Sequence, residues 1–121
     1  MYEKLDTGEV KTHWEEWAKK FGTNLRATTK NKHAKKIELH ALGDSINSLN
    51  LKNNSKILEI GCGNGHNIFF LAKTFPKLFF HGIDYVKEMI ISAKEISKKE
   101  SSKNMSFQQM DVFDINEINQ S

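Results

Sequence analysis

The sequence has few of the residues that fix a structure covalently or by strong local restraint. Its 121 residues include one cysteine, Cys62, and one proline, Pro76. A single cysteine excludes an internal disulfide and fits a reducing compartment, so we expect a cytoplasmic location. No apolar run approaches the roughly 18 residues of a membrane-spanning helix. The first ten residues also lack the basic start and apolar core of a signal peptide.

Charge of one sign is not in large excess either. The formal net charge is +3, with 38% hydrophobic and 27% charged residues, which predicts one small soluble domain without membrane association. This mild charge neither requires nor excludes a nucleic-acid partner. The basic run favours a solvated face over a nucleic-acid surface; it comprises Lys30, Lys32, Lys35 and Lys36.

The first half of the chain has helical periodicity, which predicts a helical segment over residues 1–54. Two apolar faces have this spacing: Trp14, Trp17, Ala18 and Phe21, then Leu39, Leu42, Ile46 and Leu49. The tryptophans favour core positions, with a lid over a bound ligand as the alternative. We expect this segment to cover a cofactor or substrate.

The second half, residues 55–121, alternates between two periods. Apolar runs predict strands over 56–60, 78–83 and 105–110, and amphipathic stretches predict helices over 66–75 and 86–99. Strand–helix alternation of this kind is typical of a parallel α/β sheet. We therefore expect a Rossmann-like βαβαβ unit, with strand 56–60 innermost and buried on both faces.

Three glycines separate the first strand from the following helix. Gly61, Gly63 and Gly65 allow a sharp turn and close approach of a ligand to the main chain. Ligands of open α/β sheets bind at the carboxyl ends of the strands. Asp84 and Asp111 end the second and third strands at that same edge, and an acid such as Asp84 can accept hydrogen bonds from ribose hydroxyls.

Two ligand classes fit this arrangement. A dinucleotide site requires G-x-G-x-x-G, whereas this loop reads G-x-G-x-G and has His66 at the final position. Glu59 would also place negative charge close to a pyrophosphate. A ligand with a cationic centre and no phosphate suits these surroundings better, and an NAD-type site is the alternative.

The segment "LEIGCGNG" resembles motif I of the class I S-adenosylmethionine-dependent methyltransferases, E/D-x-G-x-G-x-G, with a full match at Glu59, Gly61, Gly63 and Gly65. "HGIDYVKEMI" and "FQQMDVFD" are similar to the family's next two segments, in the same order. The resemblance covers about residues 55 to 115 and implies S-adenosyl-L-methionine as cofactor. A looser likeness of the N-terminal half to bacterial small-molecule enzymes implies a small-molecule or sugar-derived acceptor.

The resemblance also implies roles for individual residues. The three glycines would pass under the methionine part of the cofactor, with Glu59 near its amino group. Asp84 would hold the ribose, and Asp111 would bind the adenine amino group. Cys62, Tyr85, Met89 and Val112 complete the expected cofactor contacts, with Tyr85 packing on the adenine face. No metal and no catalytic residue is implied.

Structural roles are the alternatives for several of these residues. Glu59 could fix the loop, Asp84 could cap the following helix from a position outside the core, and Cys62 is best interpreted as a small apolar filler. The chain also ends after the third expected strand, whereas the family has seven. We therefore expect a truncated domain with an open sheet edge, prone to self-association, or a non-catalytic binding module.

Overall fold

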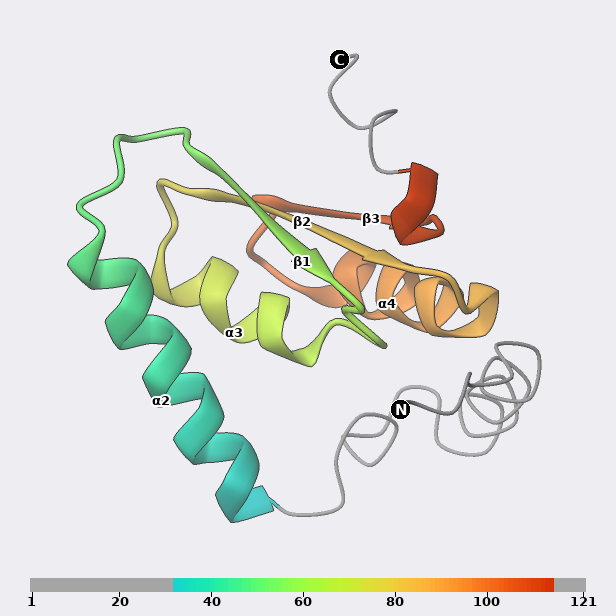
Figure 1. Ribbon diagram of the computed structural model, residues 1–121, viewed down its shortest axis with the longest axis horizontal. Helices are drawn as coiled ribbons and strands as arrows, with labels where there is room; N and C mark the ends of the chain where they lie inside the picture. Colours follow the sequence, from blue (N-terminus) through green and yellow to red (C-terminus); the bar gives the residue numbers. More distant parts are fainter. Residues whose placement is uncertain (1–31, 115–121) are drawn as a thin grey trace, which may run out of the picture.

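The computed structural model describes residues 32–114, which form an open α/β fold (Figure 1). Its elements follow one another in the order helix, strand, helix, strand, helix, strand. They are α2 (Lys32–Ser48), β1 (Lys56–Ile60), α3 (His66–Thr74), β2 (Phe79–Asp84), α4 (Lys87–Lys99) and β3 (Met105–Gln109). The alternation predicted for the second half is confirmed, with element ends displaced by no more than one residue.

The three strands are parallel and lie in the order β1-β2-β3. Ile57 pairs with Phe80, and Phe80 pairs with Met105, so that all three strands end at one edge. The expectation that strand 56–60 is innermost is wrong for this sheet, because β2 is central. Each helical crossover places the next strand beside the previous one, and within residues 32–114 no strand pairs with the other side of β1.

Both crossover helices, α3 and α4, lie on the same face of the sheet (Figure 1). The core lies between them and the strands. Phe80 from β2 is 1% exposed, and Ala72 and Ala93 let the two helices approach the sheet closely. The predicted apolar faces of both helices are confirmed; their buried members are Ile68, Leu71, Ala72, Met89, Ile90 and Ala93.

The opposite face of β1 is open to solvent among the described residues. Leu58 is 37% and Ile60 is 53% exposed, whereas Ile57 and Glu59 point to the helical side and are partly covered. The expectation that β1 is buried on both faces is therefore wrong. Burial alternates along β1, but the sequence does not show this alternation because both faces of the strand carry aliphatic residues.

The last turns of helix α2 pack near the end of α3, and α2 contributes the second predicted helical face (Figure 1). Ile46 is buried in the core cluster, and Leu42 packs against that cluster. Leu49 is 64% exposed because the helix ends at Ser48, before the expected face is complete. The first predicted face, with Trp14 and Trp17, lies outside the described residues.

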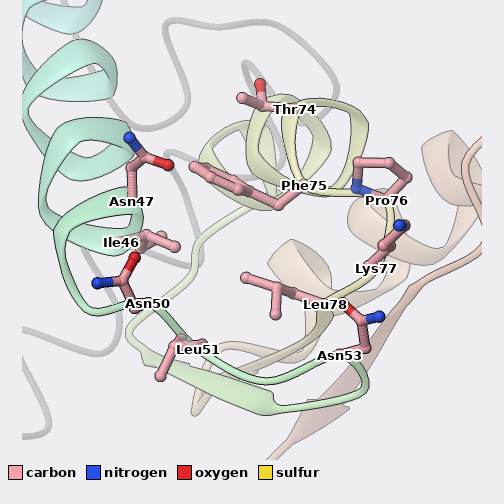
Figure 2. A pocket seen from close by; sticks show the side chains of 10 residues that line it. All are labelled: Ile46, Asn47, Asn50, Leu51, Asn53, Thr74, Phe75, Pro76, Lys77 and Leu78. Carbon is pink, nitrogen blue, oxygen red and sulfur yellow. The ribbon is translucent and has the colours of Figure 1, made fainter.

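Asn104 organises the amino end of the sheet. Its Nδ2 donates to the carbonyls of Ala72, Phe75 and Leu78 at 3.0, 3.1 and 2.8 Å, where α3 ends and β2 begins. A hollow of about 350 Å³ opens at the same end, between α2 and the end of α3 (Figure 2). Asn47, Asn50 and Asn53 contribute polar groups to its wall, and Ile46 and Phe75 contribute apolar ones.

Candidate functional site

The glycine-rich loop connects β1 to α3 through three left-handed backbone conformations. Gly61, Gly63 and Gly65 have φ values of 72°, 57° and 91°. Residues with a Cβ rarely adopt this region, so the glycines are required by the path of the chain itself. At Gly61 an added Cβ would meet no atom within 4 Å, so the backbone conformation alone accounts for that glycine.

Packing adds a second reason at Gly65. A Cβ there would lie 2.9 Å from the Phe107 ring of β3 and 3.0 Å from Phe69 of α3. Gly82 in β2 is similar, since its Cβ would lie 2.8 Å from both Cys62 Sγ and Ile68. Gly82 is therefore a fourth glycine that the site requires, in addition to the three predicted ones. Its missing side chain lets the glycine loop pack directly against β2.

The N–H groups of the loop are largely used within the protein. Gly61 and Cys62 both donate to the carbonyl of Ile83, at 2.9 and 3.0 Å, and Gly65 donates to Cys62 at 3.1 Å. Gly63 donates to Asp84 Oδ2 at 3.0 Å. A phosphate-binding loop presents such N–H groups to the ligand. This loop turns them inward, which argues against the dinucleotide alternative.

Glu59 lies under the loop, with its side chain on the helical side of β1. Its Oε2 accepts a hydrogen bond from Asn67 Nδ2 of α3 at 2.8 Å, while its buried Oε1 has no hydrogen-bond partner within residues 32–114. Burial raises the pKa of Glu59, and the Asn67 hydrogen bond and the Lys35 ammonium oppose that rise. An unpartnered buried carboxylate oxygen is costly and is well matched to a cationic donor.

Asp84 connects the loop to the following helix. Its Oδ2 accepts from Gly63 N–H at 3.0 Å, and its Oδ1 accepts from Val86 N–H at 2.9 Å, one residue before α4 begins. The side chain is buried, so the expectation that it lies outside the core is wrong. Burial raises the pKa of Asp84, and the two backbone hydrogen bonds lower it.

Two predicted contacts have buried side chains. Cys62 is 5% exposed, belongs to the core cluster and directs its thiol to the carbonyl of Gly63 at 3.5 Å. Burial raises the pKa of this thiol far above its ordinary value, with the nearby Asp84 and Glu59 carboxylates adding to the shift. Met89 on α4 is 2% exposed. Their predicted cofactor contacts stay predictions.

The remaining predicted residues lie along the carboxyl edge of the sheet. Tyr85 follows β2 and is half-buried, and its carbonyl accepts from Gln109 Nε2 at 3.3 Å. Asp111 follows β3 and accepts the Phe113 N–H through Oδ1 at 3.0 Å, so it begins a short 3₁₀ turn over 112–114. Val112 is 43% exposed in that turn. The fold thus brings all the predicted positions to one edge.

Sequence reasoning missed two polar residues of this site. Asn67 holds Glu59, and the signal for it was an amide in the first turn of the helix that follows the glycine loop. The expectation of a solvated face is wrong for Lys35 on α2, which is 6% exposed. Its ammonium lowers the pKa of Glu59, and no local motif distinguishes it from the neighbouring lysines. Within residues 32–114 no group of acids, cysteine and histidines is placed to hold a metal ion. No helix there could cross a membrane.

A parallel α/β sheet with a glycine loop and acids at its carboxyl edge has the layout of a ligand-binding α/β domain. The family model described as "Methyltransferase domain" matches residues 51–121. The chain belongs to this methyltransferase family, and its fold is the S-adenosylmethionine-binding, Rossmann-like fold of the class I enzymes.

Two curated relatives each match more than half of the chain's length. It is 36% identical over 73 residues to a protein-lysine N-methyltransferase, EFM4, of Saccharomyces cerevisiae, covering 60% of this chain and 32% of that protein. It is 33% identical over 66 residues to a tRNA (guanine-N(7)-)-methyltransferase of Oceanobacillus iheyensis, covering 54% and 31%. The chain therefore spans about a third of the length of these relatives.

Among solved structures, coclaurine N-methyltransferase bound to N-methylheliamine and S-adenosylhomocysteine superposes with a TM-score of 0.57. Its identity is 15%, and the match covers 69% of this chain and 24% of that chain. At this identity the likeness concerns the fold alone, and it confirms the predicted parallel half-sheet.

Proposed function

We propose that this chain binds S-adenosylmethionine at the carboxyl edge of the sheet and supplies the cofactor-binding portion of a methyltransferase. The observation that carries the proposal is the pairing of an inward-bonded glycine loop with the unpartnered Oε1 of Glu59. The N–H groups of Gly61, Cys62, Gly63 and Gly65 are already bonded within the protein, and the Glu59 carboxylate offers an acceptor for an ammonium group.

The remaining residues are assigned by their places along that edge. Each oxygen of Asp84 already accepts one backbone N–H, and a carboxylate has about four lone-pair sites, so two positions stay open for ribose hydroxyls. Asp111 and Val112 follow β3 and would contact adenine, with Tyr85 on its face. Gly61, Gly63 and Gly65 would lie under the methionine chain, backed by Cys62 and Met89.

The bound cofactor supplies an electrophilic methyl group on a sulfonium centre. What this chain contributes is alignment, because a fixed donor lets an acceptor attack in line, and positioning alone can lower a barrier by about 7–11 kcal/mol. A general base is needed only where the acceptor must lose a proton. We assign none among the described residues.

We also propose that the methyl acceptor is a small molecule or a sugar-derived metabolite. The likeness of the N-terminal half to bacterial small-molecule methyltransferases supports this proposal. The relatives' names mention a protein lysine and a tRNA guanine, and each match covers about a third of the relative's length. Different acceptors among relatives of one family support a common cofactor site combined with different acceptor sites. Self-association through the open edge of β1 stays a prediction.

Calorimetric titration of the full chain with S-adenosylhomocysteine and with NAD tests the cofactor. We expect binding of the first and none of the second. Asp84→Asn should weaken S-adenosylhomocysteine about 10- to 100-fold, since charge-assisted hydrogen bonds contribute about 1.5–3 kcal/mol. Asp44→Asn, on an exposed part of α2, makes the same charge change away from the site and should leave affinity unchanged.

Tighter binding of NAD than of S-adenosylhomocysteine would reject the proposed cofactor. Equal affinities for the wild type and the Asp84→Asn variant, with the fold intact by circular dichroism, would reject the ribose role of Asp84 while leaving the cofactor in place.

A further inference from the structure

The hollow at the amino end of the sheet has walls that the backbone holds in place. The loop after α2 and the loop after α3 are joined where the Asn54 N–H donates to the Lys77 carbonyl at 2.7 Å. Within the second loop, the Phe75 carbonyl accepts from the Leu78 N–H at 3.1 Å and from Asn104 Nδ2 at 3.1 Å. Its volume of about 350 Å³ lies within the range of small-ligand sites, about 300–1,000 Å³. The hollow is therefore already shaped without a ligand.

Three asparagine side chains line this hollow. The amides of Asn47, Asn50 and Asn53 form no hydrogen bond with another side chain or with the backbone among residues 32–114. Asn50 has a conformational reason for its identity, because its φ of 50° is one that asparagine adopts more readily than most residues. Asn47 and Asn53 have no such reason. Each amide offers an acceptor oxygen and two N–H donors, so the wall can bind a ligand that both donates and accepts.

The rest of the lining combines an aromatic ring with positive charge. Phe75 is partly buried, and Figure 2 shows its ring directed toward α2, while the buried Ile46 and Leu78 add apolar surface. Among the described residues Lys77 is the one charged member of the lining, and it forms no ion pair there. Lys73, in the last turn of α3, adds a second cation at this end. The charge of the hollow therefore favours an anionic ligand.

We propose that this hollow is a second ligand site and that it binds a nucleotide, with the base between Phe75 and the asparagine amides and the phosphate at Lys77. Proteins recognise unpaired nucleotides with aromatic rings, hydrogen-bonding groups and cations, and this lining holds all three. A purely apolar ligand would leave the amides without partners, and a neutral sugar would not need Lys77. The ligand is a free nucleotide or one unpaired nucleotide of an RNA strand. Because the hollow lies at the opposite end of the strands, the inference does not rest on the proposed cofactor site.

The test is calorimetry of the full chain with the four 5′-ribonucleoside monophosphates and the matching nucleosides, with S-adenosylhomocysteine in excess. We expect at least one monophosphate to bind. Asn47→Ala should weaken that monophosphate and its nucleoside alike, about threefold or more. Lys77→Gln should weaken the monophosphate about threefold or more but its nucleoside less than about twofold, since only the phosphate meets the cation. Lys94→Gln, on an exposed part of α4, makes the same charge change away from the hollow and should leave both affinities unchanged.

A short single-stranded RNA separates the two sources of the nucleotide. Binding about tenfold tighter than that of the best monophosphate, with an affinity that falls steeply with salt, assigns the site to an RNA strand, and comparable binding assigns it to a free nucleotide. Binding of none of these probes would overturn the inference, as would a bound monophosphate whose affinity neither Asn47→Ala nor Lys77→Gln changes. A chain that binds the monophosphate in this variant-sensitive way but binds no S-adenosylhomocysteine would overturn the proposed function and leave this inference in place.

Discussion

The two ends of the sheet are each organised by one polar side chain, and the two side chains have opposite hydrogen-bonding character. At the carboxyl end, Asp84 accepts N–H groups from the glycine loop and from the residue before α4. At the amino end, Asn104 donates to three carbonyls around the end of α3. Parallel βα units gather helix N-termini at one end and helix C-termini at the other, which selects an acceptor for one and a donor for the other.

The acids lie at the carboxyl end of the sheet, whereas the hollow lies at the amino end. The 350 Å³ hollow at the amino end is lined by neutral groups, apart from Lys77. The carboxyl end holds the buried Asp84 and the partly buried Glu59, both with raised pKa values, and Glu59 Oε1 has no hydrogen-bond partner among residues 32–114. We therefore expect the cofactor at the carboxyl end, where acids with raised pKa values gather, and not at the hollow.

The largest expected effect is a loss of stability when Gly65, at the carboxyl end of the sheet, is replaced. We expect Gly65→Val to reduce the free energy of unfolding by about 3–5 kcal/mol, because a β-branched residue would adopt φ of 91° and its Cβ would meet Phe107 at 2.9 Å. Urea denaturation measures this. Gly43→Val, in α2, has no neighbour within 4 Å of an added Cβ and serves as the control. Comparable stability of both variants would contradict the packing argument.

A smaller effect is expected at the amino end. Asn104→Ala removes two N–H donors shared among three carbonyls and should cost about 1–3 kcal/mol of unfolding free energy. Once folded, the variant should bind S-adenosylhomocysteine with wild-type affinity, since its change lies at the far end of the strands. A loss of ligand affinity without a loss of stability would contradict the structural role assigned to Asn104.

The smallest expected effect is the pH dependence of stability, which should be opposite in direction to the pH dependence of ligand affinity. The raised pKa values of Asp84 and Glu59 mean that the folded chain takes up protons before the unfolded chain does. Their contribution to stability is therefore fully present below the ordinary carboxyl pKa values and is lost as pH rises through the raised ones. Denaturation of wild type and Asp84→Asn across this acidic window should give a difference that grows with pH, favouring the variant.

Ligand affinity should change with pH in the opposite direction. Hydrogen bonding to ribose and to an ammonium group favours ionised carboxylates, so affinity for S-adenosylhomocysteine should decrease on acidification through the same window. A pH-independent affinity in wild type would show that neither acid faces the ligand.

Much of the fold was predictable because its signals are local. The period change between residues 39–49 and 56–110 located the helices and strands to within one residue over β1, α3, β2 and α4. The three glycines were predictable because a sharp strand-to-helix turn has few solutions, and the positive φ values confirm them.

The errors arise from information that is not local. The position of β1 at one edge of the sheet depends on which strands are present on its other side, and the exposed Leu58 and Ile60 follow from that. Asp84 was expected outside the core because a strand-end acid usually faces water. The burial of Lys35 and its effect on the pKa of Glu59 depend on where α2 lies in the fold, which no motif in either segment encodes.

Cys62 has a consequence for the chemical behaviour of the whole loop. Its thiol is enclosed between the glycine loop and Gly82, and the raised pKa keeps it protonated, whereas alkylating and oxidising reagents react with the thiolate. Modification of the chain's one sulfhydryl must therefore wait until the loop separates from β2. The rate at which Cys62 is alkylated therefore reports how often the loop separates from β2. We expect a ligand bound on the loop to lower that rate.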